Sequence, residues 1–147
     1  PNTTLEIIGD GPMRGSIKRR VERLGLGDRV ILVGQLPHDE LPARLAAAHA
    51  LVHASEREGL ANVWMEAMAS GTPVVTTNVG GAAEVVTPAT GALLPKDSSA
   101  VAMAHAVQEL LASPPDRAKI REAVLPFSWQ ANTDALYAHL ARLSGRK

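Results

Sequence analysis

Cysteine is absent from this sequence of 147 residues. Disulfide bonds, thiolate metal sites and cysteine nucleophiles are therefore excluded. Aromatic residues make up only 3% of the chain, which argues against a surface that stacks nucleic-acid bases. No apolar run approaches the roughly 20 residues of a transmembrane helix. The chain also lacks a net charge, because fifteen basic residues balance fifteen acidic ones. Nucleic-acid binders normally carry a basic excess, so we expect no nucleic-acid partner.

The residues that are present suit one folded domain spanning residues 1–147. Hydrophobic residues make up 46% and charged residues 20%, which is enough apolar material for a core. Short apolar runs alternate with amphipathic stretches, as in parallel βα units. This rhythm predicts an α/β fold with a Rossmann-like doubly wound parallel sheet, whose ligands bind beyond the carboxyl ends of the strands. We expect strands over residues 5–8, 30–33, 50–54, 73–76 and 91–94.

A glycine-rich turn follows the first expected strand. Its residues Gly9-Asp10-Gly11 begin like a dinucleotide-binding fingerprint, but the third glycine, Gly15, comes one position late. The second strand ends in Gly34-Gln35, with no acidic residue for a ribose hydroxyl. We therefore interpret this segment as a tight strand-to-helix turn and expect no NAD or FAD.

Two glutamates stand out around the third expected strand-to-helix connection. Glu58 lies in the loop after the strand at 50–54, and Glu66 lies about one turn into an apolar helix. A carboxylate on a buried helix costs several kcal/mol unless it is hydrogen-bonded or functional. Between the two, residues 59–62 present backbone N–H groups at a helix N-terminus, which favours phosphate. This pattern suits a nucleotide diphosphate sugar, although a solvated Glu58 and a Glu66 that caps backbone amides would explain the residues equally well.

Further motifs extend this pattern over most of the chain. They are Leu5-x-Ile-Ile-Gly-Asp-Gly-Pro, Arg29-Val-x-Leu-Val-Gly34, Ser55-x-x-Glu58-Gly59, Glu66-Ala-Met-Ala-x-Gly71-x-Pro73-Val-Val, Gly80-Gly81-x-x-Glu84 and Gly91-x-Leu-Leu. In this order they resemble the C-terminal half of retaining glycosyltransferases of the GT-B fold. The resemblance is greatest to family 4, also called glycosyl transferases group 1, and the E-x7-E motif of Glu58 and Glu66 is its most specific part.

The resemblance implies a role for each site residue. Glu58 would face the hexose of the donor as the catalytic residue, and Glu66 would hold the ribose hydroxyls. The donor-binding set is completed by backbone groups around the diphosphate and the base: Gly59, Leu60, Ala61, Asn62, Gln35 and Leu36. It further implies hexosyl transfer with retention of anomeric configuration, without a metal ion or a cofactor. The nucleotide diphosphate sugar is then a substrate.

The sequence also departs from the family pattern. The family holds the diphosphate with an Arg and a Lys on and after a strand that would precede Leu5, and its acceptor site lies in an N-terminal domain. Neither is found in this sequence. We therefore expect a C-terminal half truncated at its N-terminus and inactive by itself. Its sheet is expected to be split or rearranged between the strands at 5–8 and 50–54. Expected partners are the donor, a sugar, lipid or small-molecule acceptor, and the protein's own N-terminal domain. The family implies a cytoplasmic location, at the inner membrane surface when the acceptor is a lipid.

Two other functions stay open at this point. One is another GT-B enzyme, a sugar-nucleotide epimerase or a phosphorylase, which the E-x7-E motif disfavours. The other is a nucleotide-sugar binding module without catalysis. His49 and His53 have helical spacing, but His53 falls on an expected strand, so we expect no metal pair. Trp64, Met65 and Met68 are expected to be core residues, and the stripe on the last helix, residues 129–143, would be exposed in this chain.

Overall fold

The computed structural model describes residues 3–145, and the chain divides into two compact units between Leu41 and Pro42. The strands of the described residues pair in two separate parallel sheets, with the orders β1-β2 and β3-β4-β5. The first sheet belongs to the first unit and the second sheet to the second unit. The expected α/β fold with parallel strands is confirmed. The sheet is split between the strands at residues 5–8 and 51–53, where the sequence predicts it, since no described strand pairs with both.

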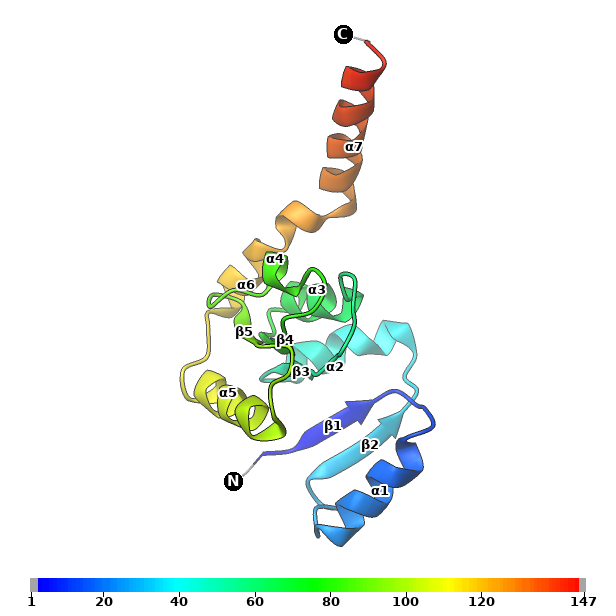
Figure 1. Ribbon diagram of the computed structural model, residues 1–147, viewed down its shortest axis with the longest axis vertical. Helices are drawn as coiled ribbons and strands as arrows, with labels where there is room; N and C mark the ends of the chain where they lie inside the picture. The colour runs from blue at the N-terminus through cyan, green and yellow to red at the C-terminus, as the bar shows by residue number, and fades with distance from the viewer. Residues whose placement is uncertain (1–2, 146–147) are drawn as a thin grey trace. The chain divides into compact units, whose positions relative to one another are not determined.

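The first unit is a βαβ unit with two parallel strands, coloured blue to cyan in Figure 1. It contains strand β1 (Leu5–Ile8), helix α1 (Arg14–Arg23), strand β2 (Val30–Gly34) and the 3₁₀ turn η1 (His38–Glu40). Beyond the carboxyl ends of the strands, the Gly9 N–H donates to the Gly34 carbonyl oxygen at 2.7 Å. None of the residues of α1 is buried.

The second unit begins with helix α2 (Leu41–Ala47), whose first residue lies at the boundary. Strand β3 (Leu51–His53), helix α3 (Asn62–Ala69), strand β4 (Val74–Thr77), helix α4 (Ala82–Val85) and strand β5 (Gly91–Leu94) follow. The chain then continues through α5 (Ala100–Ala112), α6 (Arg117–Ala123), the 3₁₀ turn η2 (Leu125–Phe127) and α7 (Trp129–Leu143). The bounds of the five strands agree with those expected from the sequence to within one residue at each end.

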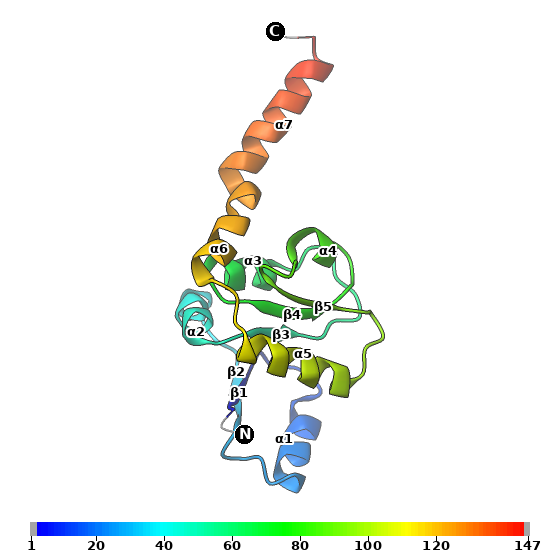
Figure 2. The ribbon, with the colours of Figure 1, turned by 90° about the vertical axis from the view of Figure 1, so that its left-hand side faces the viewer.

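Strand β4 forms the centre of the second unit. All four of its residues are buried, as expected for a parallel strand covered on both faces. Helices α3 and α6 lie on one side of the sheet and α5 lies on the other, which both views show (Figures 1 and 2). The largest fully buried side chains are Trp64, Met68 and Ile120, contributed by α3 and α6. Trp64 and Met68 are thus core residues as predicted, whereas Met65 is half-buried.

Glycine at the start of β5 permits the close approach of β5 to β4. Gly91 pairs with Val74, and a Cβ atom on Gly91 would overlap the Val74 carbonyl oxygen. Any larger residue would have to push the two strands apart at this position, so the tight β4-β5 pairing depends on this glycine.

One arginine joins three helices of the second unit. The Arg117 guanidinium on α6 donates to the Ala46 carbonyl at 2.6 Å and to the Ala48 carbonyl at 3.2 Å, at the end of α2. It also donates to the Ser70 carbonyl at 3.3 Å, at the end of α3. The last carbonyls of a helix have no partner within the helix, so Arg117 satisfies groups that would otherwise need water.

The last helix carries an exposed apolar surface. The exposed fractions are 89% for Trp129, 76% for Tyr137 and 73% for Leu143. The exposure expected for this stripe is therefore observed. None of the described helices combines the length and the apolar character needed to cross a membrane.

Candidate functional site

The loop between β3 and α3, residues 54–61, contains the first predicted glutamate and most of the predicted phosphate contacts. The loop is braced by the turn that follows β4. The Gly81 N–H donates to the Gly59 carbonyl at 2.7 Å. Gly80 has a φ of +53°, and a Cβ atom there would overlap the carbonyl oxygens of Glu58 and Gly59. The Gly80-Gly81 motif thus allows the two turns to pack backbone against backbone.

Two threonines of β4 fix the end of β3 and the start of this loop. The Thr76 hydroxyl donates to the His53 carbonyl at 2.7 Å, and the Thr77 hydroxyl donates to the Ser55 carbonyl at 2.7 Å. Both threonines are buried, so each hydrogen bond satisfies a hydroxyl that would be costly to leave unpaired. The chain is therefore held at Ser55, just before it turns toward Glu58.

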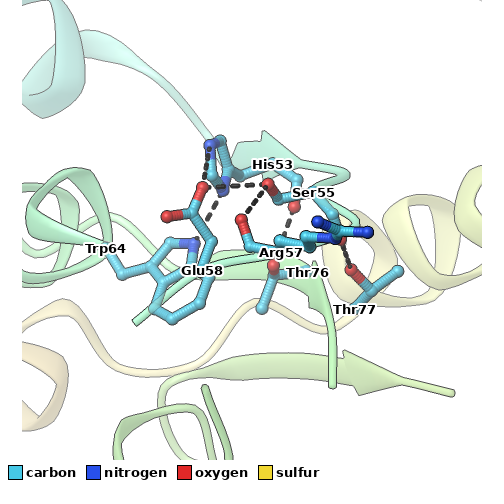
Figure 3. A network of polar contacts seen from close by, with 7 residues as sticks. All are labelled: His53, Ser55, Arg57, Glu58, Trp64, Thr76 and Thr77. Atoms are coloured by element: carbon cyan, nitrogen blue, oxygen red, sulfur yellow. Dashed lines mark hydrogen bonds and ion pairs between the residues drawn. The ribbon is translucent and has the colours of Figure 1, made fainter. Parts of the chain in front are cut away.

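The Glu58 carboxylate has two polar neighbours at one of its oxygens. The Ser55 hydroxyl donates to Oε1 at 2.9 Å, and the Nε2 atom of His53 lies 3.7 Å from the same oxygen. The Glu58 side chain is 27% exposed, so it stays accessible to a ligand. Figure 3 shows that Trp64 completes this group, because its indole N–H donates to Nδ1 of His53 at 3.1 Å.

The N-terminus of α3 follows directly after Glu58. Its N-cap residue is Ala61, and no side chain accepts a hydrogen bond there. In contrast, Ser99, Asp116 and Ser128 cap the N-termini of α5, α6 and α7 with side-chain oxygens. The first N–H groups of a helix lack partners within the helix and carry partial positive charge. This end of α3 is therefore suited to an anion.

Glu66, the second predicted glutamate, is the fifth residue of α3. It lies one turn after Asn62, and residues four apart share one face of a helix. The sequence predicts a buried helix around it, but the Glu66 side chain itself is half-buried. The difference arises because α3 buries Trp64, Ala67 and Met68 and leaves the side of Glu66 partly open.

The other predicted site residues lie at neighbouring positions or in the first unit. Gly59, Leu60 and Asn62 are exposed, Leu60 by 44%, whereas Ala61 is buried. Gln35 and Leu36 follow β2 in the first unit, Gln35 exposed and Leu36 half-buried. Within residues 3–145, no group of three or more His, Asp or Glu side chains is placed to hold a metal ion.

The family model for glycosyl transferases group 1 matches residues 1–124 of this chain. The chain belongs to the group 1 glycosyltransferase family. The family resemblance stated from the sequence motifs is thereby confirmed.

The curated relatives of this chain have names that refer to several kinds of molecule. A 2-deoxystreptamine glucosyltransferase of Streptomyces kanamyceticus is 37% identical over 111 residues, which are 76% of this chain and 29% of the relative. A GDP-mannose-dependent alpha-(1-6)-phosphatidylinositol monomannoside mannosyltransferase of Mycolicibacterium smegmatis is 34% identical over an alignment of 158 positions, which covers 100% of this chain and 41% of the relative. The chain thus spans less than half the length of these relatives.

Solved structures show the same fold. Sucrose-phosphate synthase from Thermosynechococcus elongatus matches with a TM-score of 0.80 and 36% identity, over 95% of this chain and 39% of that protein. The Anabaena protein HepE, solved in complex with UDP, matches with a TM-score of 0.80 over 97% of this chain and 42% of its own. At 24% identity, the second match supports the fold alone. The chain therefore has the fold of the matching part of GT-B glycosyltransferase structures, as the sequence predicts.

Sequence reasoning about this group 1 glycosyltransferase missed some of the groups that build the loop. His53 was considered only as a metal ligand, and Trp64 only as a core residue. His53 ends an apolar strand five residues before the motif glutamate Glu58, and this position is the signal that could have pointed to the contact. The individual roles of the predicted site residues stay predictions.

Proposed function

We propose that this chain binds the nucleotide diphosphate sugar of a hexosyltransferase that works with retention and without a metal ion or cofactor. The arrangement of one loop carries this proposal. The carboxylate of Glu58 is fixed at one oxygen just before the uncapped N-terminus of α3, and Glu66 lies one turn into the same helix. An anion site with a carboxylate on each side matches a diphosphate between a sugar and a ribose.

In this proposal each predicted residue has a defined contact. The N–H groups of Leu60 and Ala61, next to Gly59 and Asn62, bind the diphosphate. Their partial positive charge also stabilises the negative charge that develops on the leaving diphosphate, so no step requires a bound cation. The Glu66 carboxylate accepts hydrogen bonds from the ribose hydroxyls.

Glu58 contacts the hexose hydroxyls and orients the sugar for transfer. We assign it an orienting role and not that of a nucleophile. Retention of configuration is the reaction course that the family resemblance implies, and we adopt it for this chain.

Gln35 and Leu36 line the nucleotide base through backbone groups. They follow the carboxyl end of β2, which is where ligands bind in sheets of this class. The curated relatives name both glucosyl and mannosyl transfer, and one of them names GDP-mannose as the donor. We therefore propose a nucleotide hexose as the donor class for this chain.

The acceptor is a sugar, a lipid or a small molecule. We propose that it is bound by an N-terminal domain, because the relatives are more than twice as long as the matched region. The 147-residue chain should then bind donor without transferring sugar, and measurable transfer by this chain alone would contradict the proposal.

Calorimetric titration with UDP-glucose, GDP-mannose and ADP-glucose, and with each bare diphosphate, tests the proposal. We expect one base to be preferred. Glu66→Gln should lower the affinity for the donor and for the bare diphosphate equally, by about tenfold. Glu58→Gln should reduce only the extra affinity that the sugar provides. Glu109→Gln is the matched control, since Glu109 is 70% exposed on α5. Binding of none of the donors, or the two glutamates behaving in the opposite way, would contradict the proposal.

A further inference from the structure

His53 and Trp64 form a contact that the family motifs do not contain. His53 is the last residue of β3 and Trp64 the third residue of α3, so the contact bridges the two ends of the site loop. The two rings meet edge to face, with centroids 5.8 Å apart and planes at 78°. Trp64 is fully buried, and its indole N–H has an acceptor in Nδ1 of His53 at 3.1 Å.

The direction of this hydrogen bond determines where the proton of the neutral imidazole lies. An indole N–H can only donate, so Nδ1 of His53 must be the unprotonated ring nitrogen. The proton of the neutral ring is therefore on Nε2. The Nε2 atom lies 3.7 Å from Oε1 of Glu58, so the protonated ring nitrogen is the one next to the carboxylate (Figure 3).

Ser55 acts on the same oxygen from the loop itself. Its hydroxyl has a single proton and two acceptors nearby, Oε1 of Glu58 at 2.9 Å and the Arg57 carbonyl at 3.3 Å. The shorter, charge-assisted contact to Glu58 is the stronger one. Both contacts of the Glu58 carboxylate thus use Oε1 and neither uses Oε2.

We propose that Trp64 and His53 are positioning residues for Glu58, which hold Oε1 so that Oε2 is presented to the hexose of the donor. The inference rests on the proposed function, because it assigns a purpose to the orientation of a donor-binding carboxylate. Trp64 acts only through His53, and His53 acts only through Glu58. Support for a functional group through the ring nitrogen that faces away from it is a general way in which histidine orientation is fixed.

A purely structural reading predicts a different set of consequences. If His53 served only to satisfy the buried indole, its loss would affect the stability of the unit and leave sugar recognition unchanged. If His53 positions Glu58, its loss lowers the affinity for the donor more than the affinity for the bare diphosphate, because only the donor has a sugar. The ratio of these two affinities therefore separates the two roles.

The experiment compares four variants of the 147-residue chain with two matched controls. Trp64→Phe keeps an aromatic ring and removes the N–H group. His53→Leu removes both ring nitrogens, whereas His53→Gln places an amide N–H close to the Nε2 position. Ser55→Ala removes the other contact to Oε1. The controls are Trp129→Phe, at an 89% exposed tryptophan, and His105→Leu, at an exposed histidine that lies 3.3 Å from Glu109 on α5.

Three measurements are made, the first of them on the proteins that keep His53. Long-range ¹H–¹⁵N spectra at about pH 8, above the usual titration range of histidine, report which ring nitrogen of His53 carries the proton. NMR titration with UDP-glucose, GDP-mannose and ADP-glucose and with their diphosphates gives the affinity gained from the sugar. Urea unfolding of each variant checks that it is folded at the concentration used.

We expect the wild-type ring to carry its proton on Nε2, and Trp64→Phe to distribute it over both nitrogens. The sugar-dependent gain in affinity should fall about threefold to tenfold in Trp64→Phe, His53→Leu and Ser55→Ala, because each substitution removes one of the contacts that position Glu58. His53→Gln should keep most of the gain, and both controls should keep all of it. Affinity for the bare diphosphate should be unchanged throughout.

A wild-type proton on Nδ1 would overturn the proposal. An equal loss of affinity for donor and bare diphosphate would also overturn it and leave a structural role. The same holds if His53→Gln lost as much of the sugar-dependent affinity as His53→Leu. If the wild-type chain bound none of the donors, the proposed function would fail and the donor role of the pair with it. That result differs from the others because the spectra would still show the His53 proton on Nε2.

Discussion

Strand β2 of the first unit and strand β4 of the second unit are both apolar strands of parallel sheets, yet they differ in burial. Ile31 in β2 is 46% exposed, whereas Val74 and Val75 in β4 are fully buried. In the described residues β4 has a strand on each side, while β2 pairs with β1. An apolar run therefore specifies a strand, but the number of neighbours around it decides how much apolar surface it removes from water.

The largest expected effect tests this difference in the core of α6. Ile120→Ala should destabilise the second unit by about 2–5 kcal/mol, because Ile120 is fully buried and its removal leaves a cavity. Ile17→Ala on α1 should cost about 1 kcal/mol, since Ile17 is half-buried. Both tryptophans lie in the second unit, so urea unfolding followed by tryptophan fluorescence reports that unit, and far-UV circular dichroism reports both. Equal losses in the two variants would show that the units unfold as one body.

The next largest effect concerns glycines in two strand-to-helix loops, Gly80 between β4 and α4 and Gly11 between β1 and α1. Gly80→Ala should cost about 2–4 kcal/mol, because it combines a left-handed backbone conformation with an overlap against the loop at Glu58 and Gly59. It should also abolish donor binding by shifting that loop. Gly11→Ala in the first unit is the control, since nothing lies near its added Cβ atom. Thermal unfolding and donor titration measure both effects, and a Gly80→Ala protein that binds donor normally would show that the loop does not depend on this packing.

A smaller effect is expected from the threonine that holds the loop to β4. Thr77→Val keeps the shape of the side chain and removes the hydrogen bond to the Ser55 carbonyl, which should cost about 1 kcal/mol. Ser16→Ala in α1 removes an exposed hydroxyl that donates to the Met13 carbonyl at 2.7 Å, and it should cost less. Urea midpoints at constant m-value compare the two. If Ser16→Ala cost as much as Thr77→Val, burial would not be the property that separates the units.

The smallest effect should come from α7, because the apolar side chains of this helix are exposed although it belongs to the second unit. Trp129→Ala should change the free energy of unfolding by no more than about 0.5 kcal/mol, since Trp129 is 89% exposed. The same substitution should reduce self-association at high concentration, because the exposed apolar surface is smaller. Analytical ultracentrifugation measures the association. A large loss of stability would mean that α7 packs against the unit in solution.

Most of the fold was predictable from local patterns. Apolar runs marked all five strands of the described residues, four of them bounded by glycine or proline, and Gly71-Thr72-Pro73 marked the end of α3 and the start of β4. Burial could not be predicted in the same way. The run at Val30–Gly34 and the run at Val74–Thr77 look similar as sequences, and only their partners in the sheets distinguish them.

The site was predictable only in part. The glutamates and the helix N-terminus follow from motif spacing, since each lies within a short stretch of chain. The contacts that hold Glu58 and its loop do not follow from spacing. The side chains of Trp64 and His53 are 11 residues apart, and the Thr77 hydroxyl is 22 residues from the Ser55 carbonyl. Such contacts depend on how strands and helices come together, and neither periodicity nor spacing encodes that. The packing of Gly80 against the Glu58 loop is of the same kind.

The hydrogen bonds of Arg117 have a consequence for how the protein is made. Arg117 follows the carbonyls of Ala48 and Ala46 by 69 and 71 residues, and it follows that of Ser70 by 47. Ribosomes add roughly 5–20 residues per second, so Arg117 is synthesised about 3 to 14 seconds after the end of α2. During that interval β3, α3 and β4 have been made, but the ends of α2 and α3 are not yet tied together. The second unit can therefore reach its final packing only after α6 has left the ribosome, which makes the nascent chain with exposed β3 and β4 the species most in need of protection from aggregation.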